Sequence, residues 1–232
     1  MKKAGSATPV RAFDSPEAIG KHLAEQLLGL IGRARQTEKT FLLGSPTGRT
    51  PRPIYLALAR RLAETREDIS HVILVMMDEY LAKTPSGFGY ASAHAPWSCH
   101  HFARSEIVEK LNRNLPSGRG LRHERVWFPD PRDPPSYDRK IADAGGVDFF
   151  ILASGASDGH VAFNPPGSAR DSKTRIIELP ESTRKDSLQT FPAFGSLASV
   201  PTHGVSVGIA TIAAAKQAVM VLTGTSKAHS LA

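Results

Sequence analysis

The sequence contains a single cysteine, Cys99, among its 232 residues. A disulfide within the chain is therefore impossible, and the cysteine content gives no sign of a secreted, disulfide-stabilised protein. No apolar run approaches the roughly 20 residues that a membrane-spanning helix needs. The basic start of the chain, Met1 to Ser6, is not followed by an apolar segment, so no signal peptide is expected. These absences predict a cytoplasmic protein that does not bind membranes.

Basic charge is in excess but is not concentrated anywhere in the sequence. The chain has 29 basic and 22 acidic side chains, which gives a net charge of +7. The basic residues lie in separated pairs such as Arg33/Arg35 and Arg60/Arg61, and no stacking aromatic residues are interleaved with them. We therefore expect solvated basic faces and no nucleic-acid partner. The same charge balance suits a small anionic substrate.

The composition is that of a folded globular protein. Apolar residues make up 41% of the chain and charged residues 22%, which excludes wholesale disorder. A chain of this length favours one large domain. Residues 1–13 are expected to form a flexible arm and residues 14–232 a single α/β domain, because no repeat, low-complexity tract or linker interrupts them.

Short apolar runs alternate with segments of helical periodicity along the chain. Strands are expected at residues 40–43, 72–77, 126–128, 147–152, 174–179 (either a fourth buried strand or an edge strand) and 218–222. Helices are expected at residues 16–31, with Ser15 as N-cap, and at 53–64, 105–111, 137–144, 207–216 and from 226 onward. Residues 81–102 are expected to be irregular. This alternation predicts an α/β fold, with a Rossmann-like, open, mostly parallel sheet and helices on both faces.

Polar turns follow four of the expected strands. They lie at residues 44–51, 78–80, 154–160 and 223–227. The carboxyl ends of parallel strands share one edge of the sheet, where open α/β sheets bind their ligands. We therefore expect the four turns to converge on one crevice.

The first of these turns has the composition of a phosphate-binding loop. Its glycines let backbone N–H groups approach an anion, and a helix is expected to begin near Thr50. The spacing matches neither a nucleotide P-loop nor a GxGxxG fingerprint, so no nucleotide cofactor is expected. Lys227, after another turn rich in Gly, Ser and Thr, could add a point charge to the same phosphate. Taken alone, the loop fits an ordinary strand-to-helix turn equally well, and Lys227 fits a solvated surface lysine.

Three titratable residues at the strand ends suit acid–base chemistry. Asp78 follows six apolar residues, where partial burial would raise its pKa toward that of a useful base. On its own, Asp78 fits a structural acid or a helix cap better. Asp158 and His160 lie two residues apart in a glycine-rich turn, where a carboxylate and an imidazole can face one cavity. A lone histidine there would more often be simply hydrogen-bonded, but the pair favours catalysis.

Four residues between the second and third turns were tested as metal ligands: His94, Cys99, His100 and His101. Their spacing matches neither a zinc finger nor an HExxH helix, so no metal site is expected. No base is expected beside Cys99, and a cysteine nucleophile is therefore not predicted. We expect these residues to form a lid or a pocket wall.

In order and spacing, four motifs resemble those of the glucosamine-6-phosphate deaminase/isomerase family, within the 6-phosphogluconolactonase-like superfamily. They read LGSPTGRTP at residues 43–51, MDEY at 77–80, SDGHVAFN at 157–164 and TGTSKA at 223–228. The resemblance runs from about Thr40 to the end of the sequence. The tyrosine in MDEY and the AFN that follows the histidine favour the deaminase over the lactonase.

The resemblance implies a metal-free and cofactor-free reaction that converts glucosamine 6-phosphate, or a related hexosamine phosphate, to fructose 6-phosphate and ammonia. Asp78 would move a proton between C2 and C1, His160 would open the sugar ring, and Asp158 would assist the histidine. The residues implied for the phosphate are Ser45, Thr47, Gly48, Arg49, Thr50 and Lys227. Those implied for the rest of the substrate pocket are Glu79, Gly155, Asn164 and Arg184.

Several positions depart from the family pattern. Pro165 stands where the deaminases carry a glutamate that supports the histidine. Gln189 stands near a phosphate-clamping arginine of the family, for which Arg184, Lys185 or Arg49 could compensate, and Arg49 itself replaces a small residue. A lactonase in which the histidine activates water, and a phosphosugar-binding protein without catalysis, therefore stay open as alternatives. A homo-oligomer is also left open.

Overall fold

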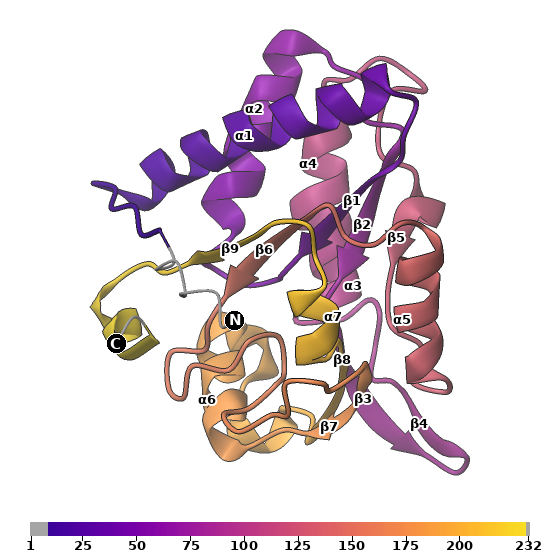
Figure 1. The fold of residues 1–232 in the computed structure, drawn as a ribbon. Coiled ribbons are helices and arrows are strands. Elements are labelled where there is room, and N and C mark those ends of the chain that lie inside the picture. Colours follow the sequence, from indigo (N-terminus) through magenta and orange to yellow (C-terminus); the bar gives the residue numbers. More distant parts are fainter. Residues whose placement is uncertain (1–8, 231–232) are drawn as a thin grey trace, which may run out of the picture.

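The computed structural model describes residues 9–230, which form two β-sheets with helices packed around them (Figure 1). The strands are β1 (Phe41–Ser45), β2 (Val72–Met76), β3 (Asp78–Thr84), β4 (Gly87–Tyr90), β5 (Val126–Trp127), β6 (Phe149–Ala153), β7 (Arg175–Glu178), β8 (His203–Ser206) and β9 (Ala218–Val221). The α-helices are α1 (Pro16–Gln36), α2 (Arg52–Thr65), α3 (Cys99–Phe102), α4 (Glu109–Asn112), α5 (Pro134–Asp143), α6 (Glu181–Thr190) and α7 (Ile209–Ala213). A π-helix, η1 (Ala103–Val108), joins α3 to α4, and short 3-10 segments are η2 (His123–Arg125), η3 (Pro192–Phe194), η4 (Leu197–Ser199) and η5 (Thr225–Ser230).

The larger sheet is parallel throughout, with the strand order β5-β2-β1-β6-β9. Its register pairs Ser45 at the end of β1 with Met76 at the end of β2, and Ala153 of β6 with Val221 of β9. The carboxyl ends of these four strands therefore lie along one edge. This confirms the predicted α/β fold, and the five observed strands differ from the predicted ranges by one or two residues at their ends.

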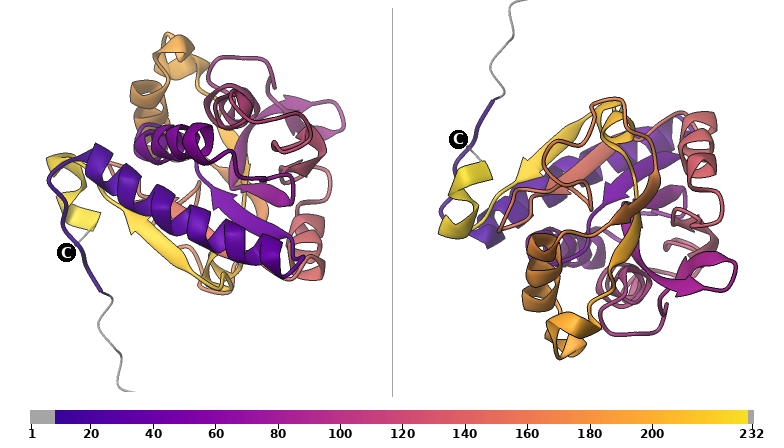
Figure 2. Two further views of the ribbon diagram at one scale, coloured as in Figure 1. Left: turned by 90° about the horizontal axis from the view of Figure 1, so that it is seen from above. Right: turned by 90° about the horizontal axis from the view of Figure 1, so that it is seen from below.

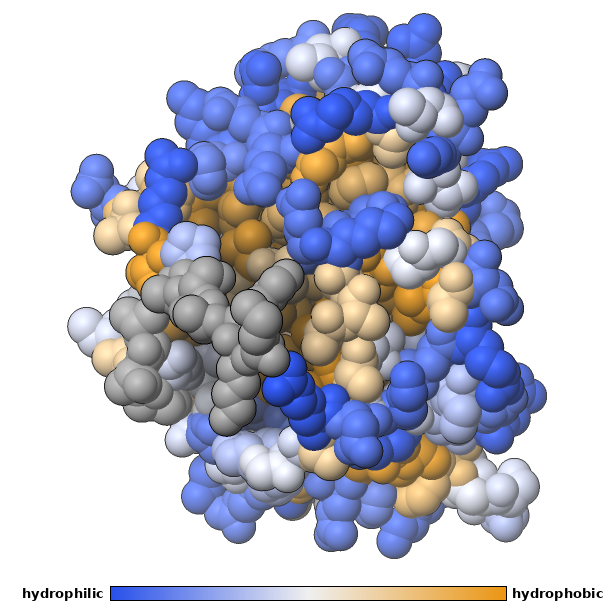
Figure 3. All heavy atoms as spheres, in the orientation of Figure 1, coloured by the Kyte–Doolittle hydropathy of each residue, from blue (hydrophilic) through white to orange (hydrophobic). Residues whose placement is uncertain are grey.

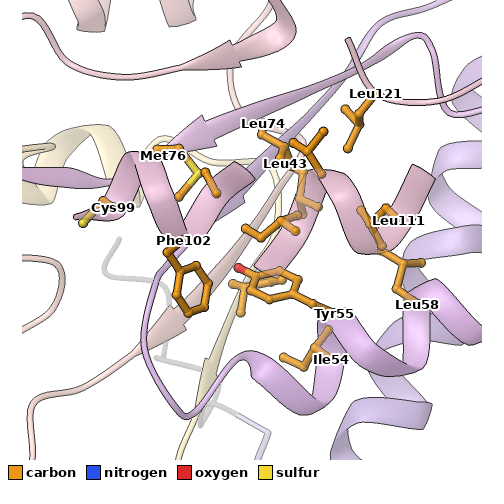
Figure 4. Close-up of a cluster of buried hydrophobic side chains, with 14 of the residues drawn as sticks. Leu43, Ile54, Tyr55, Leu58, Leu74, Met76, Cys99, Phe102, Leu111 and Leu121 are labelled. Atoms are coloured by element: carbon orange, nitrogen blue, oxygen red, sulfur yellow. The ribbon is translucent and has the colours of Figure 1, made fainter. Parts of the chain in front are cut away.

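Two hydrophobic clusters cover the two faces of this sheet. One face, with Leu43 and Leu74, packs against α1, α2 and α4 (Figure 4). The other face, with Leu42 and Ile73, packs against α5 and α7. Successive residues of a strand point to opposite faces, so a continuous apolar run such as residues 72–76 is what a sheet covered on both faces requires. Figure 2 shows helices on either side of the sheet, as predicted.

A second, antiparallel sheet adjoins the carboxyl edge of the first, with the order β4-β3-β8-β7. The strand expected at residues 174–179, as either a fourth buried strand or an edge strand, is β7 (Arg175–Glu178), and it lies at an edge of this second sheet. The prediction that residues 81–102 are irregular is wrong, because they contain the second half of β3, all of β4 and the whole of α3.

Three strands, β3, β4 and β8, were not predicted, because they lack the continuous apolar runs that indicate the other strands. β3 changes from buried residues at its start to exposed ones from Ala82 onward. β8 contains Gly204, where a Cβ would lie 2.5 Å from the Phe163 ring. The helix predicted at residues 207–216 is shorter in the structure, where α7 covers Ile209–Ala213. It begins after Gly208, whose backbone passes close to the Ser172 carbonyl. The preceding strand, β8, was not predicted. α6 was also missed, because its sequence is strongly polar.

The amino-terminal end of the described chain packs on α1. Ser15 caps α1 as predicted, since its hydroxyl accepts a hydrogen bond from the Ala18 N–H at 3.1 Å. Of the expected flexible arm, residues 1–8 lie outside the described residues, and residues 9–13 form neither helix nor strand. Phe13 nevertheless contacts the His22 ring of α1, with the ring centroids 5.2 Å apart.

The surface is mostly hydrophilic. Figure 3 shows charged and polar residues over most of one face, with apolar side chains visible between them. Large hydrophobic side chains that are exposed within residues 9–230 include Val10, Leu56, Tyr90 and Met220. None of the helices in residues 9–230 has the length and apolar character needed to cross a membrane.

Gly44 in β1 tests the packing of the central strands. A Cβ at this position would lie 2.0 Å from the ring of the fully buried Phe150 in β6. We predict that Gly44→Ala lowers the free energy of unfolding by about 1–3 kcal/mol, because the packed ring has no space to move into. Urea denaturation followed by circular dichroism measures the change.

Gly32→Ala in α1 is the matched control, since nothing lies within 4 Å of a Cβ built there. That substitution should stabilise the helix by about 0.5–1 kcal/mol. A Gly44→Ala protein as stable as the parent would contradict the close approach of β1 and β6.

Candidate active site

One cavity of about 360 Å³ lies at the carboxyl edge of the parallel sheet. Its walls come from the turns after β1, β6 and β9, from the start of β3 and from α6. The predicted site residues that line it are Thr47, Gly48, Arg49, Thr50, Asp78, Gly155, His160 and Lys227. The four turns thus converge on one hollow, and its size falls within the range of small-molecule sites, roughly 300–1,000 Å³.

The loop after β1 is held from beneath by the hydrophobic core. Tyr55 of α2 is buried, and its hydroxyl donates a hydrogen bond to the Pro46 carbonyl at 2.7 Å. α2 begins at Arg52, so the positive end of its dipole adjoins the loop. Gly48 has a φ of +98°, which a residue with a Cβ rarely adopts. Ser45 is fully buried below the loop and does not line the cavity, because its hydroxyl turns to a backbone carbonyl of its own strand.

Asp78 stands where the chain passes from the first sheet to the second. β2 ends at Met76 and β3 begins at Asp78, whose side chain lines the cavity although the residue is only 7% exposed. Burial raises the pKa of Asp78 to about 7, a hydrogen bond from the Cys99 thiol at 3.3 Å opposes the rise, and the charge of Glu79 adds to it. A carboxyl group with a pKa near neutrality can both take and return a proton.

Glu79 lies behind the cavity and holds the start of α3. Its two carboxylate oxygens accept hydrogen bonds from the Cys99 N–H at 3.1 Å and the His100 N–H at 2.8 Å. The His100 ring also meets Glu79 through Nδ1, at 2.6 Å. Glu79 was expected in the substrate pocket, but it does not line the cavity. These contacts occupy its carboxylate, which instead holds the segment that carries Cys99.

Asp158 and His160 form a hydrogen-bonded pair in the turn after β6. Asp158 Oδ1 lies 2.6 Å from His160 Nδ1 and accepts the His160 N–H at 3.0 Å. Partial burial tends to raise the pKa of Asp158, but hydrogen bonds from Ser182 and His160 outweigh it, so its pKa lies below the ordinary value. An ionised carboxylate can only accept, so Nδ1 carries the proton of this bond and Nε2 is the nitrogen available to a ligand. Gly155 permits the arrangement, since a Cβ there would lie 2.2 Å from the imidazole.

Helix α6 supports this turn with residues that the sequence analysis did not single out. The Ser182 hydroxyl donates a hydrogen bond to Asp158 Oδ2 at 2.6 Å. Asp186 accepts the Ser157 N–H at 2.9 Å and the Ser157 hydroxyl at 2.5 Å. The signal that could have revealed these supports is the density of short polar side chains in residues 181–187, which suit hydrogen bonds to a nearby backbone.

Two cations line the cavity, Arg49 and Lys227. The pKa of Lys227 lies below its ordinary value, mainly because of burial, and its amine contacts the Ser154 carbonyl. Of the three residues that could compensate for Gln189, only Arg49 is in position. Arg184 donates hydrogen bonds to backbone carbonyls at 2.6 and 3.1 Å, and Lys185 forms an exposed ion pair outside the cavity.

Asn164 and Arg184 were expected in the substrate pocket but do not line it. The Asn164 amide donates to the Val161 and Val207 carbonyls at 3.0 and 2.7 Å and its oxygen accepts from Arg175 at 2.9 Å. Both side chains are therefore used to hold loops around the cavity. Conversely, Tyr80 and Phe163 line the cavity without having been predicted.

The candidate metal ligands His94, Cys99, His100 and His101 contact three separate residues and do not converge on one point. Cys99 contacts Asp78 and His100 contacts Glu79, whereas His94 and His101 both contact Arg104, at 3.4 and 3.2 Å. The prediction that no base lies beside Cys99 is wrong, because the Asp78 carboxylate is 3.3 Å from the thiol. Cys99 is buried and does not line this cavity.

Within residues 9–230, one group of side chains has the spacing of metal ligands, with Asp158, His160 and Asp186 all within 4.8 Å of one another. All four of its carboxylate oxygens already accept hydrogen bonds from Ser157, Ser182 or His160. This hydrogen-bond network accounts for the close approach of the three side chains.

Comparisons with known proteins place the chain in a family. A sequence profile of the family described as glucosamine-6-phosphate isomerases/6-phosphogluconolactonase matches residues 14–232. The chain is 36% identical, over 221 residues, to the glucosamine-6-phosphate deaminase of Streptomyces avermitilis, with 93% of this chain and 76% of the relative covered.

Two solved structures share the fold. A monomeric glucosamine-6-phosphate deaminase matches with a TM-score of 0.77 and 24% identity, over 94% of this chain and 83% of that one. The 6-phosphogluconolactonase of Leishmania guyanensis matches with a TM-score of 0.67 and 18% identity, over 97% of this chain and 85% of that one. At these identities the likeness shows a common architecture.

The buried Asp78 carboxylate predicts a specific pH dependence of stability. Its pKa is raised in the folded protein, so between about pH 4 and pH 7 the folded state holds a proton that the unfolded chain has lost. Stability must therefore fall as the pH rises through this window. Asp78→Asn removes the effect, so the variant should gain about 2–4 kcal/mol relative to the parent between pH 4 and pH 8.

Urea denaturation at several pH values measures this gain. Asp143→Asn, on the exposed surface of α5, is the control for the loss of one carboxylate. A difference between the Asp78→Asn variant and the parent that does not change with pH would contradict the raised pKa.

Proposed function

The chain belongs to the family of glucosamine-6-phosphate isomerases and 6-phosphogluconolactonases, and we propose that it converts a hexosamine 6-phosphate and water to a ketose 6-phosphate and ammonia. The observation that carries the proposal is that the Asp78 carboxylate, the His160 imidazole and a loop suited to anions face one cavity. The name of the S. avermitilis relative supports glucosamine 6-phosphate as the substrate. The isomerisation consists of proton transfers, for which the chain's own acids and bases suffice.

The phosphate of the substrate is assigned to the loop at residues 46–50. Backbone N–H groups of this loop, the N-terminal end of α2 and the two cations Arg49 and Lys227 all favour an anion there. Binding energy from the phosphate, which does not react, then holds the sugar in place over the reacting groups.

Asp78 is assigned as the base. In the open-chain aldose it takes the proton from C2, and the electron pair moves toward C1 as the carbonyl oxygen is protonated. Asp78 returns the proton to C1, which leaves the nitrogen doubly bonded to C2. Water then adds to C2 and ammonia leaves. The pKa of about 7 suits a group that must be ionised in one step and protonated in the next.

His160 is assigned to opening the sugar ring, by moving a proton between the C1 hydroxyl and the ring oxygen through Nε2. The departure at Pro165 bears on this role. Asp158 already accepts from Nδ1, and Ser182 holds Asp158 in turn. Because a carboxylate fixes the tautomer of the imidazole, a glutamate at position 165 is not needed for this purpose. This arrangement weighs against a protein that only binds phosphosugars.

The lactonase alternative draws on the solved 6-phosphogluconolactonase structures that share the fold. In that reaction His160 would activate water against the lactone carbonyl, and no carbon–hydrogen bond would break. The buried carboxylate of Asp78 would then have no proton to move. The two reactions are therefore separated by whether C2 exchanges its proton.

The direct test supplies glucosamine 6-phosphate to the purified protein in D₂O. We predict ammonia and ketose phosphate as products, with solvent deuterium at C1 of the ketose phosphate and, through the reverse reaction, at C2 of the recovered amino sugar. Asp78→Asn should abolish both turnover and exchange while leaving phosphosugar affinity within a few-fold. Exchange that persists in this variant would remove Asp78 as the base. Hydrolysis of 6-phosphogluconolactone without any turnover of the amino sugar would establish the alternative.

The two cavity cations give a separate prediction. Arg49→Ala and Lys227→Ala should each raise KM for the phosphosugar about tenfold or more, with a smaller change in kcat, because they contact a part of the substrate that does not react. Lys185→Ala is the control, since Lys185 is exposed and pairs with Glu181 outside the cavity. Steady-state kinetics measures both constants. A variant whose kcat falls at an unchanged KM would contradict the phosphate assignment.

A further inference from the structure

The only cysteine of the sequence is buried directly beneath the Asp78 carboxylate. Its Sγ lies 3.3 Å from Asp78 Oδ1 and 3.7 Å from the Thr47 hydroxyl in the loop after β1. Cys99 itself is 1% exposed and does not line the cavity. In Figure 4 it lies at the margin of the hydrophobic cluster, at the start of α3.

The position of the sulfur is fixed by the backbone around it. The Cys99 N–H donates to Glu79 Oε1 at 3.1 Å, and the next N–H donates to Oε2 at 2.8 Å. Ser98 caps α3, since its hydroxyl accepts the His101 N–H at 3.0 Å. Glu79 is next to Asp78 in the chain. Its hydrogen bonds to the backbone of Cys99 and His100 therefore hold the thiol close to the Asp78 carboxylate.

The thiol is the donor in its contact with Asp78. Burial raises the pKa of Cys99 well above its usual range, and the charges of Glu79 and Asp78 raise it further. The sulfur therefore keeps its proton near neutral pH and can donate it to Oδ1. The Thr47 hydroxyl can donate to the sulfur in turn, so a chain of polar contacts links the loop after β1 to Asp78.

We infer that Cys99 is a positioning residue for Asp78, and that its S–H···Oδ1 hydrogen bond stabilises the ionised carboxylate and fixes its orientation toward the cavity. The catalytic consequence rests on the proposed function, whereas the effect on the carboxylate does not. An S–H donor is weaker than an O–H donor, so it supports the ionised form without trapping it.

Several other charged or titratable groups surround Asp78. Glu79 follows it in β3, and the cavity is also lined by Arg49 from the loop after β1, His160 from the turn after β6, Asp186 from α6 and Lys227 from η5. Within residues 9–230, the side-chain hydrogen bond that reaches the Asp78 carboxylate is the one from Cys99. Loss of the thiol should therefore make Asp78 ionise at a higher pH.

The test is a titration of Asp78 in the protein without substrate, by ¹³C NMR of labelled aspartate, with the signal assigned through Asp78→Asn. Cys99→Ala should shift the midpoint upward by about 0.5–1 pH unit, a three- to tenfold change in proton affinity. Cys99→Val lacks the donor but fills the space, and it should shift the midpoint in the same direction. Cys99→Ser keeps a donor, and a stronger one, so its midpoint should lie at or below that of the parent.

An unchanged midpoint in both the alanine and the valine variants would overturn the inference. Equal shifts in the serine and alanine variants would also overturn it, because packing alone would then explain the result. Where the amino sugar is turned over, Cys99→Ala should lower kcat three- to tenfold at pH 6 and much less at pH 9, with KM little changed. A loss that is uniform across pH would contradict the positioning role, and the titration stays decisive even if this substrate is not turned over.

Discussion

A carboxylate buried where two sheets meet is the constraint on which the rest of the site depends. The run of buried apolar residues in β2 carries the chain directly to Asp78, so the acid enters the cavity from the hydrophobic interior. Burial disfavours its charge and brings its pKa to about 7. The surroundings must then offer enough support for the ionised form to exist. The Cys99 thiol supplies that support from below, and the cations Arg49 and Lys227 line the same cavity.

The second requirement is an imidazole held in one tautomer. In this chain the support for His160 comes from within its own turn and from α6. Asp158 holds Nδ1, Ser182 holds Asp158, and Asp186 holds the backbone of Ser157. The turn at residues 154–160 is thereby held in place by α6, a helix that is polar throughout most of its length. This accounts for a proline at position 165 without loss of a carboxylate partner for the histidine.

The parallel sheet and the convergence of its turns could be predicted from the sequence because apolar runs such as residues 72–76 identify strands buried on both faces. The second sheet could not, since β3 changes from buried to exposed residues along its length and the four residues of β4 include no buried one, so neither strand has a continuous apolar run. Partners also escaped prediction. Cys99 and Asp78 are 21 residues apart, and their contact depends on how α3 returns to the sheet edge. Arg184 has the chemistry of a phosphate ligand, yet backbone carbonyls of the following loops occupy it.

The most direct measurement of the central claim is a crystal structure of the Asp78→Asn variant with glucosamine 6-phosphate bound. The expected structure has the phosphate in the loop at residues 46–50, in contact with Arg49 and Lys227, and C2 of the sugar against the side chain at position 78. The ring oxygen should lie within hydrogen-bond reach of His160. A phosphate bound elsewhere, or a sugar whose C2 points away from position 78, would contradict the assignment of a buried aspartate as the base.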